Sequence, residues 1–83
     1  MLILTQNGDA IVEKSRDYHI SYFIRDKKDA VVTCRFSEGG EANSITLGVY
    51  GGAERARQII KEMYARFDGA DDPLRCKYEM PEE

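Results

Sequence analysis

The amino-acid sequence predicts an α+β fold: an antiparallel five-stranded meander, one C-terminal amphipathic helix packed on one face, and an extended C-terminal tail. Apolar and polar residues alternate along several short stretches before residue 51, which is typical of strands. From Ala53 onward the apolar spacing changes to that of a helix. A chain of 83 residues has room for a single core, so these elements must pack together.

The first two strands are predicted from the dipeptide Asn7-Gly8, which separates two apolar runs. Both central residues of a type I′ turn need positive φ angles, and Asn-Gly is the strongest short signal for such a turn. The predicted register pairs Leu4 with Ile11, Ile3 with Val12, and Gln6 with Asp9. The chain therefore opens with a predicted hairpin.

A second hairpin is predicted from residues 18–25 and 30–36, which alternate and are joined by the polar turn at 26–29. The faces that carry Ile20 and Val32 are expected to point toward the core, because they hold most of the apolar side chains.

The fifth strand is predicted at residues 44–50, after a glycine-containing flexible loop at 37–43. Strict alternation places Leu47 on the inner face and Tyr50 on the outer face. Ile45 and Val49 are expected to point inward with Leu47.

The helix is predicted to begin after Gly52, which offers no side-chain cap, and to end at Gly69 in the left-handed conformation. Its apolar arc, expected to cover the sheet, consists of Ala56, Ile59, Ile60, Met63 and Phe67. Basic residues border this arc on both sides: Arg57 and Lys61 on one, Arg55 and Arg66 on the other.

The tail is predicted to be extended, which divides the chain into a domain at 1–69 and an acidic tail at 70–83. Its apolar residues alternate between two prolines, Pro73 and Pro81, as in an edge strand. The alternating residues are Leu74, Cys76, Tyr78 and Met80. The tail either adds a short strand to the edge of its own sheet, docks on a partner, or remains disordered.

Composition and motifs limit the classes of function that the chain is expected to have. A net charge of -3 and a pI of about 5.1 disfavour nucleic acid as the main partner. No apolar run is long enough for a leader or a membrane span, so a cytoplasmic protein is expected. Cys34 and Cys76 are expected to remain reduced, with a bridge or a reactive thiol as alternatives. His19 is the single histidine, and no catalytic, metal or cofactor motif accompanies it, so no enzyme is expected.

The candidate binding residues lie on the face of the sheet that points away from the helix. Phe23 and Tyr50 would form an apolar patch there, with Arg25 and Arg35 around it. Tyr78 adds a contact residue in the tail. We therefore expect a small non-enzymatic interaction module that binds a protein partner or a second copy. The alternative is a single-stranded nucleic-acid-binding protein, in which bases stack on the aromatic residues of the open face.

Four segments carry a resemblance to a set of small uncharacterised proteins of Gram-positive bacteria and their prophages. They are the opening Met-Leu-Ile-Leu-Thr-Gln-Asn-Gly at 1–8, Ile-Thr-Leu-Gly-Val-Tyr at 45–50, Glu-Arg-Ala-Arg at 54–57, and Tyr-Glu-Met-Pro-Glu-Glu at 78–83. The resemblance implies a bacterial or phage protein of the cytoplasm and assigns no role to any residue.

Overall fold

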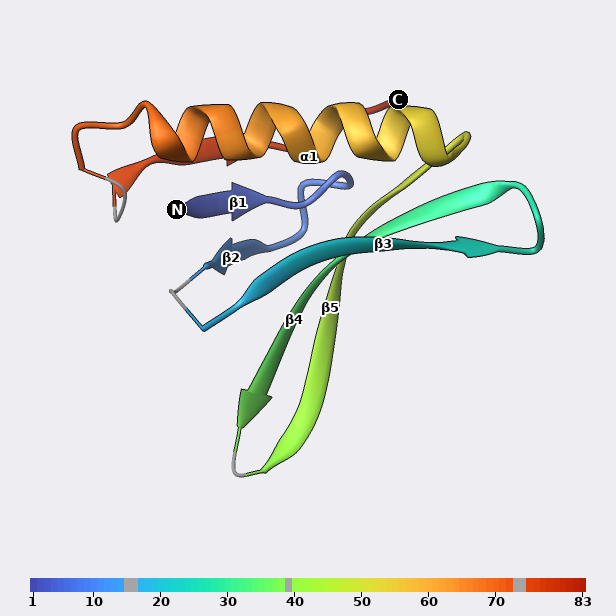
Figure 1. Ribbon diagram of the computed structural model, residues 1–83, viewed down its shortest axis with the longest axis horizontal. Coiled ribbons are helices and arrows are strands. Elements are labelled where there is room, and N and C mark those ends of the chain that lie inside the picture. The colour runs from blue at the N-terminus through green and yellow to red at the C-terminus, as the bar shows by residue number, and fades with distance from the viewer. Residues whose placement is uncertain (15–16, 39, 73–74) are drawn as a thin grey trace.

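The chain forms an α+β fold with six strands and one helix in the part that the structure describes (Figure 1). The computed structural model describes residues 1–14, 17–38, 40–72 and 75–83. The elements in chain order are β1 (Leu2–Leu4), β2 (Ile11–Glu13), β3 (His19–Arg25), β4 (Asp29–Glu38), β5 (Glu41–Tyr50), α1 (Ala53–Asp68) and β6 (Lys77–Glu79). The predicted fold class is therefore confirmed.

The five expected strands are all present, but they belong to two three-stranded sheets instead of one continuous meander. The first sheet has the order β2-β1-β6 and the second has the order β3-β4-β5. The strand that follows Glu13 in the chain belongs to the second sheet, because β3 pairs with β4 and not with β2. Alternation within a strand does not specify which neighbour that strand pairs with. No local sequence pattern therefore indicates that the strands divide into two sheets.

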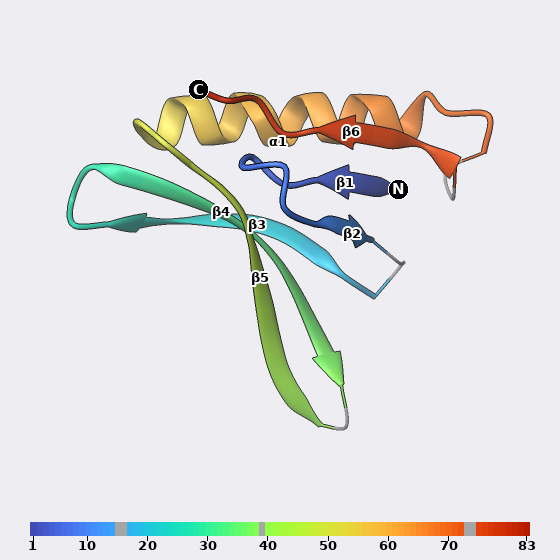
Figure 2. The same cartoon turned by 180° about the vertical axis from the view of Figure 1, so that it is seen from behind.

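The tail completes the first sheet. Residues of β6 pair in parallel with β1, so that Ile3 lies opposite Tyr78. The strand and the residues after it run back along α1 toward the start of the helix (Figure 2). The prediction that the tail adds to its own sheet is thus confirmed, although Pro73 and Leu74 lie outside the described residues. Because Tyr78 and Met80 are part of the core, the tail is not a separate appendage to residues 1–69.

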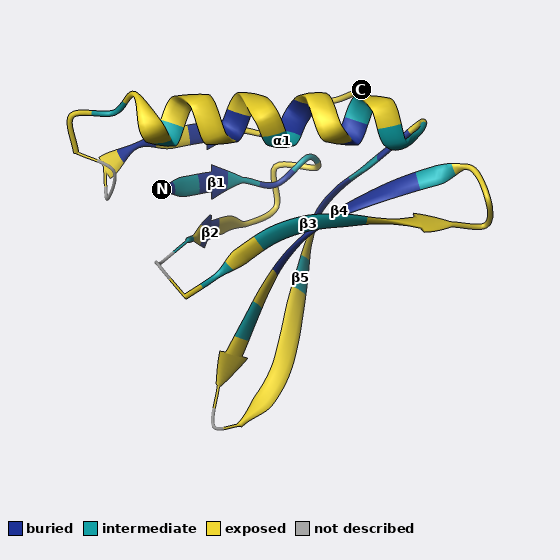
Figure 3. Ribbon diagram, in the orientation of Figure 1, coloured by how far each residue is buried: buried dark blue, intermediate teal, exposed yellow. Residues whose placement is uncertain are grey.

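The core lies where α1 and the inner faces of the two sheets meet (Figure 3). Every element except β3 contributes at least one buried side chain to it, and β3 packs against it through partly buried side chains. The core residues are Met1, Ile3, Val12, Ala30, Val32, Cys34, Leu47, Tyr50, Ala56, Ile59, Met63, Cys76, Tyr78 and Met80.

The turn between β1 and β2 is wider than the predicted two-residue turn. The backbone N–H of Thr5 donates to the Ala10 carbonyl at 3.0 Å, which leaves residues 6–9 in the loop. Gly8 has the expected positive φ of 75°, but Asn7 does not share it. Instead the Asn7 side-chain oxygen accepts hydrogen bonds from the Thr5 hydroxyl and the Asp9 N–H. The predicted pairs of Leu4 with Ile11 and Ile3 with Val12 are confirmed.

Gln6 leaves the first hairpin and joins the two sheets. It does not pair with Asp9 as predicted; its backbone N–H donates to the Leu47 carbonyl at 2.8 Å. Its side-chain amide brackets Val49, accepting from the Val49 N–H at 2.7 Å and donating to the Val49 carbonyl at 3.0 Å. The edge of β5 is therefore satisfied by a side chain that imitates a neighbouring strand.

The β4–β5 hairpin is longer than predicted and projects away from the body of the molecule (Figure 1). Residues 37–38 and 41–43, predicted to lie in a flexible loop, pair across this hairpin. Gly40, which precedes β5, has a positive φ of 85°, and Gly39 lies outside the described residues. The turn after β3 is one residue shorter than the predicted 26–29, because Asp29 begins β4 and pairs with Arg25; Asp26 and Lys27 have positive φ.

A β-bulge reverses the predicted orientation of Tyr50. Val32 lies opposite Gly48 while Thr33 lies opposite Thr46, so Leu47 is an extra residue in β5. The inner and outer faces exchange at this point, and Val49 joins the outer row beside Val31. Tyr50 consequently turns into the core, where it is 3% exposed.

Gly48 makes room for the Tyr50 ring. A Cβ atom at position 48 would lie 2.7 Å from the Tyr50 hydroxyl oxygen. That hydroxyl donates a 2.8 Å hydrogen bond to the Pro81 carbonyl, so the ring is held at both ends. We expect Gly48→Ala to lower the free energy of unfolding by about 1–3 kcal/mol, because a buried ring must shift. Urea denaturation measures the change. Gly51→Ala is the control, because the space around a Cβ at position 51 is open; an equal loss in both variants would contradict this account.

The helix begins after Gly52 with no side-chain cap, as predicted. Its end differs from the prediction, because Gly69 has φ -85° and is not left-handed. The Gly69 N–H still donates to the Ala65 carbonyl, and the next N–H donates to Phe67. The last carbonyls are thus satisfied by a tightened final turn and need no left-handed residue.

Candidate functional site

The outer face of the β3-β4-β5 sheet holds three of the five predicted binding residues. Phe23 is 53% exposed, and Arg35 lies opposite His19 across the β3–β4 ladder. Arg25 is paired with Asp29, with 3.6 Å between the charged atoms. The other apolar residue expected in this patch, Val31, is buried because β4 is the central strand of the sheet. The predicted apolar patch is therefore reduced to one aromatic ring.

The two remaining predicted residues, Tyr50 and Tyr78, are buried and hold the tail in place. The Tyr78 hydroxyl donates to the Glu62 carboxylate of α1 at 3.0 Å. Burial, followed by the hydrogen bond to Glu62, raises the pKa of Tyr78 to about 12. Burial also raises the pKa of Tyr50. Neither ring is available for stacking against a ligand, so the prediction that both rings face a partner is wrong.

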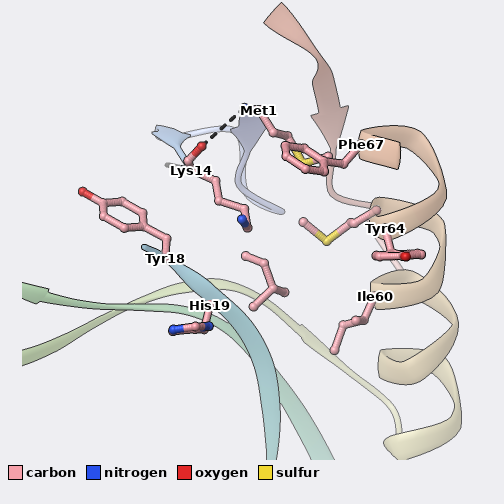
Figure 4. Close-up of a pocket in the computed structure, with 9 residues that line it drawn as sticks. Met1, Lys14, Tyr18, His19, Ile60, Tyr64 and Phe67 are labelled. Carbon is pink, nitrogen blue, oxygen red and sulfur yellow. Dashed lines mark hydrogen bonds between the residues drawn. The ribbon is translucent and has the colours of Figure 1, made fainter. Parts of the chain in front are cut away.

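A groove between β3 and α1 is a better candidate for a binding surface than the outer face of the β3-β4-β5 sheet. It consists of two adjoining hollows, of about 390 Å³ and 370 Å³, which share Ile60. We call this surface the edge groove. Ile60 extends from α1 toward β3, and Phe67 extends toward Met1 and Lys14 (Figure 4). Its lining residues are Met1, Lys14, Tyr18, His19, Ile20, Ser21, Tyr22, Arg57, Ile60, Lys61, Met63, Tyr64 and Phe67.

The lining residues show that the groove follows the backbone edge of β3. Five consecutive residues at 18–22 contribute to it, and consecutive side chains of a strand point to opposite faces. A hollow that contacts side chains from both faces of the strand must run along the edge of that strand. β3 is an outer strand of its sheet, and within the described residues no strand pairs with its free edge.

Apolar side chains form the centre of the groove. Ile20 and Ile60 are only partly buried by the core, and Met63 closes the floor. Tyr64, on the solvent side of α1, is 70% exposed. Ile60 and Met63 belong to the helical arc that covers the core, and Ile60 is only partly buried, so one side of the arc extends past the sheet and remains accessible.

Basic groups surround this apolar centre. Arg57 and Lys61 lie beside the hollow nearer the start of α1. At the other end the Lys14 ammonium reaches into the groove and lies 5.2 Å from the centre of the Phe67 ring (Figure 4). No acidic residue is among the residues that line the two hollows. The groove therefore has a positive rim although the chain carries a net charge of -3.

The two cysteine thiols are enclosed in the core. Burial raises the pKa of the Cys34 thiol, which disfavours the reactive thiolate. Cys34 and Cys76 are both free and buried. Within the described ranges, no three His, Cys, Asp or Glu side chains are grouped so that they could hold a metal ion. The same residues include no helix with the length and apolar character needed to cross a membrane.

Comparison with protein-family models, curated proteins and solved structures finds no match to this chain. Its class is therefore defined by its own geometry: a small α+β domain in which a helix flanks a free strand edge. The resemblance to small proteins of Gram-positive bacteria and their prophages stays a prediction.

The sequence analysis missed the groove itself, although it identified several of its parts. Arg57 and Lys61 were placed beside the apolar arc, and Ile20 was placed on the inner face of its strand. Ile60 was assigned to the core, yet it is only partly buried. One usable signal was the width of the arc, which is larger than one face of a three-stranded sheet requires. Nothing local indicated that Lys14 reaches Phe67, 53 positions further along the chain.

Proposed function

We propose that this chain is a small non-enzymatic interaction module of the cytoplasm that binds an extended segment of a protein partner in the edge groove. The observation that carries the proposal is the free edge of β3 beside an accessible apolar flank of α1. A strand edge presents backbone N–H and C=O groups to an added strand, and an adjoining groove accepts alternate side chains of that strand. Both features extend along residues 18–22.

The length of the groove suits such a segment. The four strand residues that line the groove, at 19–22, span about 13 Å at roughly 3.3 Å per residue, and Tyr18 extends this wall by one residue. On the helix, the lining residues from Arg57 to Phe67 span about 15 Å at 1.5 Å per residue. The two walls match in length, so an extended segment of about five residues would contact both along its whole length.

The other strand edges support the choice of β3. Gln6 occupies the edge of β5 at Leu47 and Val49, beside the body of the molecule, and β6 covers the edge of β1. The outer strands of the first sheet, β2 and β6, have three residues each, whereas β3 has seven. Monomeric proteins usually protect their long edge strands, because an exposed edge can pair with a strand of another chain. An edge that is left open beside an apolar groove is therefore a docking surface.

The outer face supports the nucleic-acid alternative less well. Of its two predicted aromatic residues only Phe23 is exposed, and Arg25 is engaged with Asp29. Single-strand binders combine several stacking rings with a continuous positive groove. The edge groove, in contrast, has three basic residues among those that line it: Lys14, Arg57 and Lys61.

Selection of peptides from a random twelve-residue library tests the proposed function. The full chain is expected to enrich peptides whose binding falls at least tenfold in Ile60→Gln, because that change places a polar amide in the middle of the groove. The matched control is Ile11→Gln, which changes an isoleucine that is 68% exposed on β2. Circular dichroism establishes that both variants are folded. If no peptide is enriched, or if both variants bind equally well, the proposal is wrong.

A further inference from the structure

We infer that the occupant of the edge groove is an acidic extended segment, which carries apolar side chains together with aspartate or glutamate. This inference rests on the proposed function and adds the chemistry of the partner. Its support comes from the charges along α1 and from the way the same helix holds the chain's own tail.

The basic residues of α1 divide into two pairs with different surroundings. Arg55 and Arg66 face the tail and donate hydrogen bonds to its carbonyl groups. Arg57 and Lys61 face the edge groove, and within the described residues neither has an ion pair or a hydrogen-bonding side-chain partner. Two cations beside an apolar groove favour a ligand that brings carboxylates to its rim.

The tail shows how α1 holds an extended segment on its other flank. Arg66 Nη1 donates to the Lys77 carbonyl at 3.1 Å, and Arg55 donates to the Glu83 carbonyl from Nε at 3.0 Å and from Nη2 at 2.8 Å. Between these two arginines, Tyr78 and Met80 are buried at alternate positions, while the backbone pairs with the edge of β1. The segment is acidic, with glutamates at positions 79, 82 and 83.

The two flanks of the helix therefore share three features: a strand edge, an apolar arc and a pair of basic residues. On one flank the chain's own tail occupies them, and the two arginines bind its carbonyl groups. On the other flank the strand edge is that of β3 and the basic pair is Arg57 and Lys61. The tail is already bound within its own chain, so the segment that fills the edge groove comes from a partner protein.

Strand addition decides which side chains of the segment reach α1. When a segment pairs with β3, every second side chain points to the same side of the sheet as Ile20, toward Ile60 and Phe67. The residues between them point to the outer face of the sheet. Arg57 and Lys61 lie on the α1 side, beside the hollow that Ser21 and Tyr22 line, so carboxylates on that side of the segment would pair with these cations.

Three pools of fluorescein-labelled nine-residue peptides test this inference by fluorescence anisotropy. In each pool valine, isoleucine, leucine or tyrosine is combined in random order with a second residue type: aspartate or glutamate in the first pool, glutamine or serine in the second, lysine in the third. We expect the acidic pool to bind at least tenfold more tightly than the lysine pool, and its binding to weaken as sodium chloride is raised.

Charge reversal on the protein supplies the control. Arg57→Glu/Lys61→Glu is expected to remove the preference for the acidic pool, whereas Lys27→Glu/Lys28→Glu, with the same change of net charge in the turn before β4, is expected to retain it. If the neutral or the lysine pool binds as well as the acidic pool and still depends on Ile60, the inference fails while the proposed function stands. If no pool binds, both are wrong.

Discussion

A chain that ends at Gly69 is expected to lose cooperative unfolding. The missing segment contributes Cys76, Tyr78 and Met80 to the core and supplies the only neighbour of β1 on that edge. Burying a large apolar side chain is worth about 1.5–3 kcal/mol, and small domains are stable by about 5–15 kcal/mol in all. Two such side chains and a strand therefore represent much of the total stability.

Urea denaturation followed by far-ultraviolet circular dichroism measures this effect. The control is a chain that ends at Pro81, which keeps β6 and loses only two carbonyl acceptors, those of Glu82 and Glu83. That shorter truncation is expected to cost about 1–2 kcal/mol. A sigmoidal transition for residues 1–69 with an unchanged midpoint would show that the tail is an appendage and would contradict this account.

Alkaline pH is expected to destabilise the protein through Tyr78. Burial and the hydrogen bond to Glu62 raise its pKa from 10.0 to about 12 in the folded state. Below pH 10 the tyrosine is protonated in both states, so its contribution to stability is fully present. Between pH 10 and 12 the unfolded chain loses this proton and the folded chain keeps it, so the free energy of unfolding falls. A pKa difference of two between the folded and unfolded states corresponds to about 3 kcal/mol in the free energy of unfolding.

The pH dependence is measured as the free energy of unfolding at pH 8 and pH 11 in the native chain and in Tyr78→Phe. Tyr78→Phe lacks the titrating hydroxyl and is expected to lose less stability between these two values. Some loss remains, because burial also raises the pKa of Tyr50 and of Cys34. An identical loss in both proteins would mean that Tyr78 is not the group that limits alkaline stability.

Local sequence patterns predicted the elements and missed their long-range arrangement. Alternation located β3 and β4, and the helical spacing located α1, because each pattern depends on neighbours in the same segment. The pairing of Ile3 with Tyr78 joins opposite ends of the chain, so no local pattern reveals it. The first sheet could not be completed from the sequence for that reason.

The largest error in the prediction of the candidate site came from one extra residue in β5. The bulge at Leu47 exchanges the faces of β5, which turns Tyr50 from a surface residue into a core residue. The outer-face positions of Phe23 and Arg35 were predicted correctly, because β3 and the first part of β4 pair without a bulge. The edge groove needed the tertiary structure, since its walls come from separate elements and Lys14 joins them from a third.

Amide hydrogen exchange is the most direct test of the claim that an extended segment docks on β3. The full chain is labelled with ¹⁵N, and exchange is followed by NMR with and without the tightest peptide from the library selection. Strand addition is expected to slow exchange of β3 amides within residues 19–25 and to leave the amides of β2 unchanged. If protection appears instead along β1, or if only amides around Arg35 and Ser44 on the outer face respond, the edge groove is not the docking site.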